Sequence, residues 1–528
     1  MIFLVEFGVH DGAALSTLYL ATDGYTSKPT DAPSNQYYMP RLRSAGSIER
    51  HMFASGDGVS GGTTRGGGEA GFGTIQVVNG RPYGGSELID SWVNLAFRSV
   101  TIRSLDTAKQ ALVQATTRFV GVAEQLVATN AIDQFEIRIY DRTADLDRPL
   151  LTHAYAGTTL ATGQGIEGET DLTDQIKPKI WGRKNNVSCV AVNIYDLIYQ
   201  VSDGPINSIA VYDGGLALTS SGDFGSLASL QSASLVPGSY GTCLSLGIFR
   251  LGGVAYGTLT ADVVEGATEA DRTIGQIAAR MLSWLQSMYP TISVSFAPGT
   301  VAALDALNSA EAGIIVEGTE TAQSAFGRLL GSIGAWMLPV STSASQFELG
   351  ILVPPAGSPV ATFDIDDCIG GSPQRVDTGD DGRGIPATKI IVKYDQLGLV
   401  QNGEQLFGAV TTDRKSYLST EWRQAIAEDA EVLTKWPNAP IITVESCLAT
   451  QVAAQAEANR LRALYSVPRE IYRMVLPLAD AAACELGSVV ELTSRGGRMG
   501  LADGKLFRVL GRIDDYGDLP TVTIDCWG

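Results

Sequence analysis

The segment QFEIRIY at residues 134–140 alternates apolar with polar or charged side chains. The segment FRSVTIR at residues 97–103 follows a similar pattern. Successive side chains of a strand point to opposite faces, so a period of two predicts half-buried β-sheet at both places. The apolar opening at residues 1–7 carries Glu6 and no cationic leader region, which predicts a first strand rather than a secretory signal.

A second β-rich region is predicted from residue 163 to about residue 251. Its short runs of β-branched and aromatic residues are separated by turn signals such as Asp203-Gly-Pro205 and Asp213-Gly-Gly215. Closely spaced turns between such runs favour a small antiparallel barrel or sandwich.

Helical spacing of apolar residues is clearest in residues 268–290, where Thr268 is expected to cap the helix, and in residues 321–336. Residues 106–130 are ambiguous, because their alanine-rich first part, 107–114, looks helical, whereas their later part favours a strand. In the last third we expect strands at 388–394, 470–477, 488–493, 505–513 and 521–527, a helical turn at 421–436 and a helix at 449–465.

The expected fold is mixed and mainly β with α+β insertions, built from several small antiparallel β-barrel or sandwich domains. The length of 528 residues allows about three or four domains. We predict a β domain at 1–160 with a glycine-rich loop at 55–73, a β-rich domain at 161–266, an α+β domain at 267–372, and a β-rich domain with one helix at 373–528.

Composition excludes several classes of function. The formal net charge of −19 repels phosphate and anionic lipid, which argues against a basic DNA-binding face. No segment approaches the ~18 uninterrupted apolar residues that a membrane-spanning helix needs, so we expect a soluble protein. The glycine content, 59 residues, predicts many turns.

Residue types that often form metal or redox sites are scattered. The six cysteines form no C-x-x-C pair, which predicts buried free thiols and assembly in a reducing compartment. The seven tryptophans are spread over the predicted domains as core anchors would be. The three histidines, His10, His51 and His153, are too few and too dispersed for a catalytic or metal-binding motif.

Three short motifs match catalytic signatures without the context that the chemistry requires. Gly58-Val-Ser60-Gly-Gly62 fits a nucleophile elbow but lies inside the glycine-rich loop, with no helix after the serine. The G-x-G-x-x-G match at residues 163–168 carries glutamates that would repel a pyrophosphate, and it predicts a turn. Asp377-Thr-Gly379 is half of an aspartic-protease signature and has no second copy.

An aspartate-rich stretch leaves cation binding open, although its spacing departs from an EF-hand loop and a solvated acidic loop explains it better. Its members are Asp364, Asp366, Asp367, Asp377, Asp380 and Asp381. We therefore predict no catalytic, cofactor-binding or metal-binding residue, no cofactor and no enzymatic activity.

The order of segments resembles bacteriophage tail-tip proteins. The passages LYLATDGY at 18–25, GTIQVVN at 73–79 and FRSVTIR at 97–103 are similar to a distal-tail-type β domain. Further similarity to the same tail-tip proteins lies in KPKIWGR at 177–183, YQVSDG at 199–204, VYDGG at 211–215 and FRLGG at 249–253. The helix at 454–464, LGSVV at 486–490 and IDCWG at 524–528 resemble baseplate hub proteins.

This resemblance implies a structural baseplate hub of a phage or gene-transfer-particle tail tip. Such hubs form a homotrimer in which two tube-like β domains per subunit make a ring that continues the tail tube and opens for DNA ejection. The implied partners are a distal tail protein ring, the tape measure protein and tail fibres, with DNA in transit. The implied location is the virion, after assembly in the host cytoplasm.

Two other functions remain open on the sequence alone: a receptor-binding tail adhesin, and a tail-associated cell-wall hydrolase. The acidic charge agrees with the hub interpretation, since an acidic wall repels passing DNA. The glycine-rich loop is expected either to be a plain surface loop or to adjust between a sixfold tube and a threefold tip.

Overall fold

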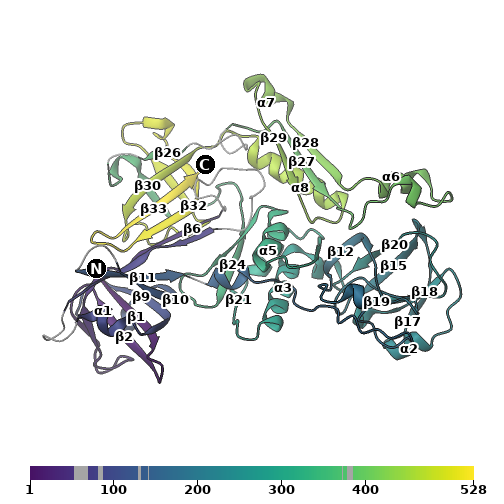
Figure 1. The fold of residues 1–528 in the computed structure, drawn as a ribbon. Coiled ribbons are helices and arrows are strands. Elements are labelled where there is room, and N and C mark those ends of the chain that lie inside the picture. The colour runs from purple at the N-terminus through teal and green to yellow at the C-terminus, as the bar shows by residue number, and fades with distance from the viewer. Residues whose placement is uncertain (53–68, 81–86, 129–132, 141, 371–372, 377–384) are drawn as a thin grey trace.

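A computed structural model describes residues 1–52, 69–80, 87–128, 133–140, 142–370, 373–376 and 385–528. Strands dominate, in several separate sheets, which confirms the mixed, mainly β fold class. The sequence predicts that the small domains are barrels or sandwiches. In the described ranges none of the sheets closes into a barrel. Figure 1 shows the sheets from the two ends of the chain together on one side, helices α3 and α5 in the middle, and the β12–β20 region on the other side.

The N-terminal part forms a nine-stranded sheet, and both alternating segments are strands in it. A β-bulge next to Phe97 shifts the register between β1 and β9. The bulge explains why Phe97 and Val100 are both buried although they are three residues apart in the chain. In sheet order the strands are β3 (Tyr25–Thr26), β4 (Tyr37–Pro40), β2 (Leu15–Ala21), β1 (Ile2–His10), β9 (Ala96–Leu105), β10 (Thr116–Ala128), β11 (Gln134–Tyr140), β8 (Thr74–Val78) and β5 (Leu42–Ser44), with α1 (Leu88–Trp92) nearby in sequence.

The C-terminal sheet is completed by an N-terminal hairpin. Strand β32 pairs with β31 through its first half and with β6 through its second half, on either side of a bulge between Val509 and Gly511. One hydrophobic core joins residues from both ends of the chain, including Phe3 and Tyr516. The strands are β25 (Ala361–Asp364), β31 (Val489–Thr493), β32 (Lys505–Asp515), β33 (Thr521–Trp527), β30 (Ile471–Pro477) and β26 (Gln374–Val376), with β6 (Ser47–His51) and β7 (Glu69–Phe72) added.

Two five-stranded sheets form the region on the opposite side of Figure 1. The first consists of β16 (Leu216–Ala217), β15 (Ser208–Asp213), β20 (Leu259–Val264), β12 (Lys179–Ser188) and β22 (Gly313–Val316). The second consists of β13 (Val190–Asn193), β14 (Ile198–Gln200), β19 (Ile248–Leu251), β18 (Ser239–Cys243) and β17 (Thr219–Asp223), with α2 (Leu227–Ser232) beside β18.

The central helices begin later or end earlier than the sequence pattern suggests. Thr268 and Asp271 close a 3₁₀ turn, η6 (Glu269–Arg272), and α3 (Ile274–Met288) has its own cap at Thr273. Helix α5 (Ala322–Gly331) stops before Trp336, which lies on a strand, so the predicted helix at 321–336 was too long. Near them lie α4 (Thr300–Leu307) and a small sheet of β21 (Ser295–Phe296), β24 (Gln346–Ile351) and β23 (Ala335–Pro339).

The remaining sheet, β28 (Arg423–Glu428), β27 (Lys389–Tyr394) and β29 (Ile441–Glu445), packs one face against α8 (Gln451–Tyr465). The helical turn predicted at 421–436 was half wrong, because strand β28 precedes the short α7 (Ala430–Lys435). Residues 107–114 are also mainly a turn that ends in a 3₁₀ helix, η2 (Leu112–Gln114). Helix α6 (Thr412–Leu418) reaches across to β15.

Candidate functional site

Of the three short motifs, the structure describes only residues 163–168. Gly58–Gly62 and Asp377–Gly379 lie outside the described residues. Residues 163–168 form a turn, as predicted, and the carbonyl oxygens of Gly163 and Gly165 accept hydrogen bonds from Asn193 Nδ2 at 3.0 and 2.9 Å. The turn is therefore fastened to strand β13 and offers no strand-to-helix phosphate cradle.

The three described aspartates of the acidic stretch are paired with two arginines. Arg495 contacts Asp364 at 3.0 Å and also Asp367, while Arg498 contacts Asp366. Asp377, Asp380 and Asp381 lie outside the described residues. Within the described ranges no group of three or more His, Cys, Asp or Glu side chains is arranged to hold a metal ion.

The three histidines contact acids or backbone. His51 is buried, with Nε2 at 2.7 Å from Glu49 and Nδ1 at 3.8 Å from Asp525. His153 Nδ1 lies 2.7 Å from Asp203, and His10 Nδ1 accepts from a backbone amide. Among the described residues no serine or cysteine is hydrogen-bonded to a histidine ring, so these pairs lack a nucleophile.

All six cysteines are free thiols. Four are buried, as expected: Cys243, Cys368, Cys484 and Cys526. Cys189 and Cys447 are only partly covered. Four tryptophans are buried, namely Trp92, Trp181, Trp336 and Trp527, and the other three are partly covered.

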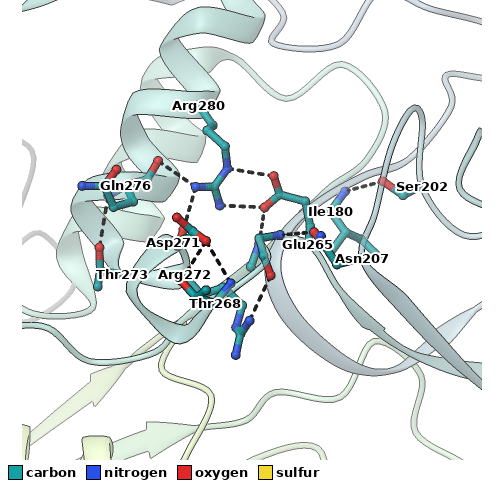
Figure 2. A network of polar contacts seen from close by, with 12 residues as sticks. Ile180, Ser202, Asn207, Glu265, Thr268, Asp271, Arg272, Thr273, Gln276 and Arg280 are labelled. Carbon is teal, nitrogen blue, oxygen red and sulfur yellow. Dashed lines mark hydrogen bonds and ion pairs between the residues drawn. The ribbon is translucent and has the colours of Figure 1, made fainter. Parts of the chain in front are cut away.

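A polar network ties helix α3 to the β12–β20 sheet (Figure 2). Arg280 holds both carboxylate oxygens of Glu265 at 2.7 Å and donates to the carbonyl oxygen of Asp271 at 2.6 Å. Glu265 also accepts from the backbone N–H of Gly182 at 2.9 Å, and Arg272 donates to the carbonyl oxygen of Gly266 at 2.9 Å. Because a bidentate arginine–carboxylate pair fixes direction as well as distance, this network sets the angle between helix and sheet.

A second network joins the two ends of the chain. Arg50 on β6 lies directly opposite Arg512 on β32, and their side chains are only 6 and 4 % exposed. Glu485 contacts Arg50 at 2.7 Å and Arg512 at 3.2 Å, while Asp514 holds Arg512 at 2.8 Å. Like charges that face each other across a strand pair repel, so the carboxylates are what permit this pairing.

A cavity of about 470 Å³ lies where α5, the end of β29 and Trp422 meet. Its lining includes Arg328, Glu445 and Cys447, but Arg328 is paired with Glu320 at 2.7 Å and Glu445 with Lys393 at 2.9 Å. The lining holds no histidine beside the thiol and no unpaired pair of carboxylates. The described lining therefore offers no acid–base pair of side chains.

Sequence reasoning missed the two charge networks. Arg50 occupies an inward position of strand β6, in phase with Ile48, and Arg512 occupies a buried position of β32. A long charged side chain at an apolar position of a strand signals a buried ion pair. This signal is present in the sequence at Arg50, but the sequence does not indicate which residue pairs with it, because the partner Glu485 is 435 residues away.

Comparisons with known proteins give low similarity. No family model and no curated protein matches the sequence. Among solved structures, the 43 kDa tail protein of prophage MuSo2 from Shewanella oneidensis is 10 % identical, with coverage of 100 % of this chain and 98 % of that chain and a TM-score of 0.42. Prophage tail protein gp18 from Listeria monocytogenes is 10 % identical, with coverage of 99 and 94 % and a TM-score of 0.39.

A chain in the virion of a native gene transfer agent particle is 15 % identical, with coverage of 67 % of this chain and 84 % of that chain and a TM-score of 0.39. In the part of the chain that the structure describes, no helix has the length and apolar character needed to cross a membrane.

Proposed function

We propose that the protein is a structural component of a bacteriophage-type tail, and specifically a baseplate hub that forms a trimeric ring at the tail tip. The resemblance of the sequence to tail-tip proteins, and at its C-terminal end to baseplate hub proteins, supports this proposal. In this proposal the four predicted domains, 1–160, 161–266, 267–372 and 373–528, supply the ring and its contacts with a distal tail ring, tape measure and fibres. No catalytic, cofactor or metal site is assigned to it.

The observation that carries the proposal is an open strand edge in the nine-stranded sheet. Strand β2 pairs along its length with β1, whereas among the described residues its other edge pairs with β4 only at Leu20 and Ala21. Thr22 N donates to Phe3 O, and this phase directs the backbone N–H groups of Thr17 and Tyr19 away from β1. A long unpaired edge is a liability in a monomer, and ring formation would cover it.

The charge supports the same arrangement. A net charge of −19 gives the assembled wall an excess of carboxylates, which repel the DNA backbone and reduce its adhesion during passage. In this proposal the protein forms part of the wall of the tail tube, and each subunit contributes open sheets to that wall.

Light scattering combined with negative-stain images tests this proposal. We expect a mass of about 167 kDa, three times the 55.8 kDa chain, and threefold rings with a central passage. Thr17→Pro removes an outward N–H and no hydrogen bond to β1, so we expect it to reduce trimer formation while the fold stays intact. A compact dimer, or particles without a passage, would contradict the proposal.

A further inference from the structure

Asparagine is followed directly by glycine at Asn79-Gly80 and at Asn402-Gly403. Asparagine is among the thermolabile residues of proteins. Its side-chain amide carbon is open to attack by the backbone nitrogen of the next residue, and glycine hinders that attack least because it has no Cβ atom. The two pairs therefore share one chemistry, and their surroundings in the fold decide which of them reacts.

The side-chain amide of Asn79 is held at both of its ends. Its Nδ2 donates to Glu87 at 3.0 Å, and its Oδ1 accepts from the backbone N–H of Ile89 at 3.3 Å. The backbone N–H of Asn79 also donates to Asp133 O at 2.7 Å. An amide fixed in this way must break two hydrogen bonds before it can turn toward the following nitrogen, so the fold protects this pair.

Asn402 lies beside an exposed 3₁₀ turn, η8 (Gly403–Gln405), and its side-chain amide makes no capping hydrogen bond with that turn. Gln405 holds the backbone of Asn402 instead, through Asn402 N to Gln405 Oε1 at 2.8 Å and Gln405 N to Asn402 O at 2.9 Å. No described residue accepts a hydrogen bond from Gly403 N, and a Cβ atom at Gly403 would meet nothing within 4 Å. The attacking nitrogen is therefore accessible, and so short a 3₁₀ turn opens readily.

We propose that Asn402 is a site of spontaneous deamidation. Hydroxide removes the proton of Gly403 N, this nitrogen attacks Asn402 Cγ, and the new C–N bond closes a five-membered succinimide ring. The bond from Cγ to the side-chain nitrogen breaks, and that nitrogen takes up a proton from water and leaves as ammonia. A water molecule then opens the ring at one of its two carbonyl carbons, which gives either aspartate or isoaspartate. The net reaction consumes one water and releases one ammonia.

The modified residue lies between two anchored positions. Gln401 is buried and its N–H donates to Leu418 O at 2.9 Å, while Phe407 N donates to Gly214 O at 2.9 Å in the turn between β15 and β16. The Phe407 ring packs so closely on Gly214 that a Cβ atom there would lie 2.7 Å from it. In isoaspartate the main chain runs through the side chain and gains one methylene between these anchors. The product therefore loosens the link between α6 and the β12–β20 sheet.

Peptide mapping by mass spectrometry tests this inference on the full-length protein, aged in mildly alkaline buffer at physiological temperature. We expect the mass gain of an amide-to-acid conversion in the peptide that contains Asn402, in two products that chromatography separates. In the native protein the gain should appear at least about tenfold faster at Asn402 than at Asn79. In urea, where the fold no longer protects Asn79, the two rates should become similar.

Gly403→Ala is the matched variant, because its Cβ atom has open space and Gly403 does not have the positive φ that favours glycine. The methyl group hinders the attacking nitrogen, so deamidation at Asn402 should slow by at least about tenfold, with Asn79 unchanged. After ageing, the amide hydrogens of Phe407 and α6 should exchange faster in the wild type than in Gly403→Ala.

Equal native rates at Asn402 and Asn79, aspartate as the sole product, or an unchanged rate in Gly403→Ala would overturn the proposed site. Equal hydrogen exchange in the aged wild type and the aged variant would overturn the proposed loosening. None of these results depends on the proposed tail role.

Discussion

Replacing Glu485 with Gln should loosen the joint between the two ends of the chain. The substitution removes the carboxylate that separates Arg50 from Arg512, which face each other across β6 and β32. Removing one partner of a fully buried ion pair costs about 3–5 kcal/mol. Glu485 is 58 % exposed and Arg512 retains Asp514, so we expect about 2 kcal/mol.

Hydrogen exchange measured by mass spectrometry reports this local free energy, because a chain of this size is not expected to unfold in one step. A loss of 2 kcal/mol corresponds to about 30-fold faster exchange in β6 and the second half of β32. The control Glu428→Gln breaks the exposed pair with Lys389 and should cost about 0.5 kcal/mol, or about twofold in rate.

The pH dependence has a definite sign. Burial raises the pKa of Glu485, but Arg50 and Arg512 together lower it by more than burial raises it. The pKa in the folded state therefore lies below the ordinary value of 4.5. The stabilisation is therefore complete above about pH 4.5 and is lost as the pH falls through the folded pKa. The difference between wild type and Glu485→Gln should close in that acidic range. Unchanged exchange in β6 at neutral pH would refute the reasoning.

Three other outcomes are expected. Glu265→Ala should speed hydrogen exchange in α3 by about 30-fold, because it leaves Arg280 without its carboxylate partner. Hydrogen exchange in α8 should not change. Lys184→Met should raise the free energy of unfolding measured in urea, because it removes a buried charge. Burial lowers the pKa of Lys184 in the folded state, so the wild-type side chain loses its charge as the pH rises toward 10.5, and the stability difference between the variant and the wild type should shrink. A thiol reagent should modify Cys447 in the native protein before Cys526, which is fully buried and whose pKa burial raises; equal rates would contradict that burial.

Local patterns predicted the strands well. Residues 134–140 and 521–527 are strands with the expected bounds, because their alternation or β-branched content needs only local information. The helix predicted at 449–465 is α8, which starts two residues later at its Thr450 cap. The error at 321–336 arose because the amphipathic stretch continues into strand β23, and the error at 421–436 because strand β28 leads directly into helix α7; no proline marks either junction.

Long-range pairing could not be predicted from the sequence. Nothing in the segment Ser47–His51 indicates that it pairs with β32, because register across more than 400 residues depends on tertiary packing. The predicted absence of a catalytic constellation stays a prediction, and Gly58–Gly62 lies outside the described residues.

Cryo-electron microscopy of the assembled particle tests the central claim most directly. The account predicts three copies of the chain around a common axis, with their sheets in the wall of a central channel and the edge of β2 paired with a neighbour. Copies placed at the periphery, with their sheets facing no shared channel, would contradict it.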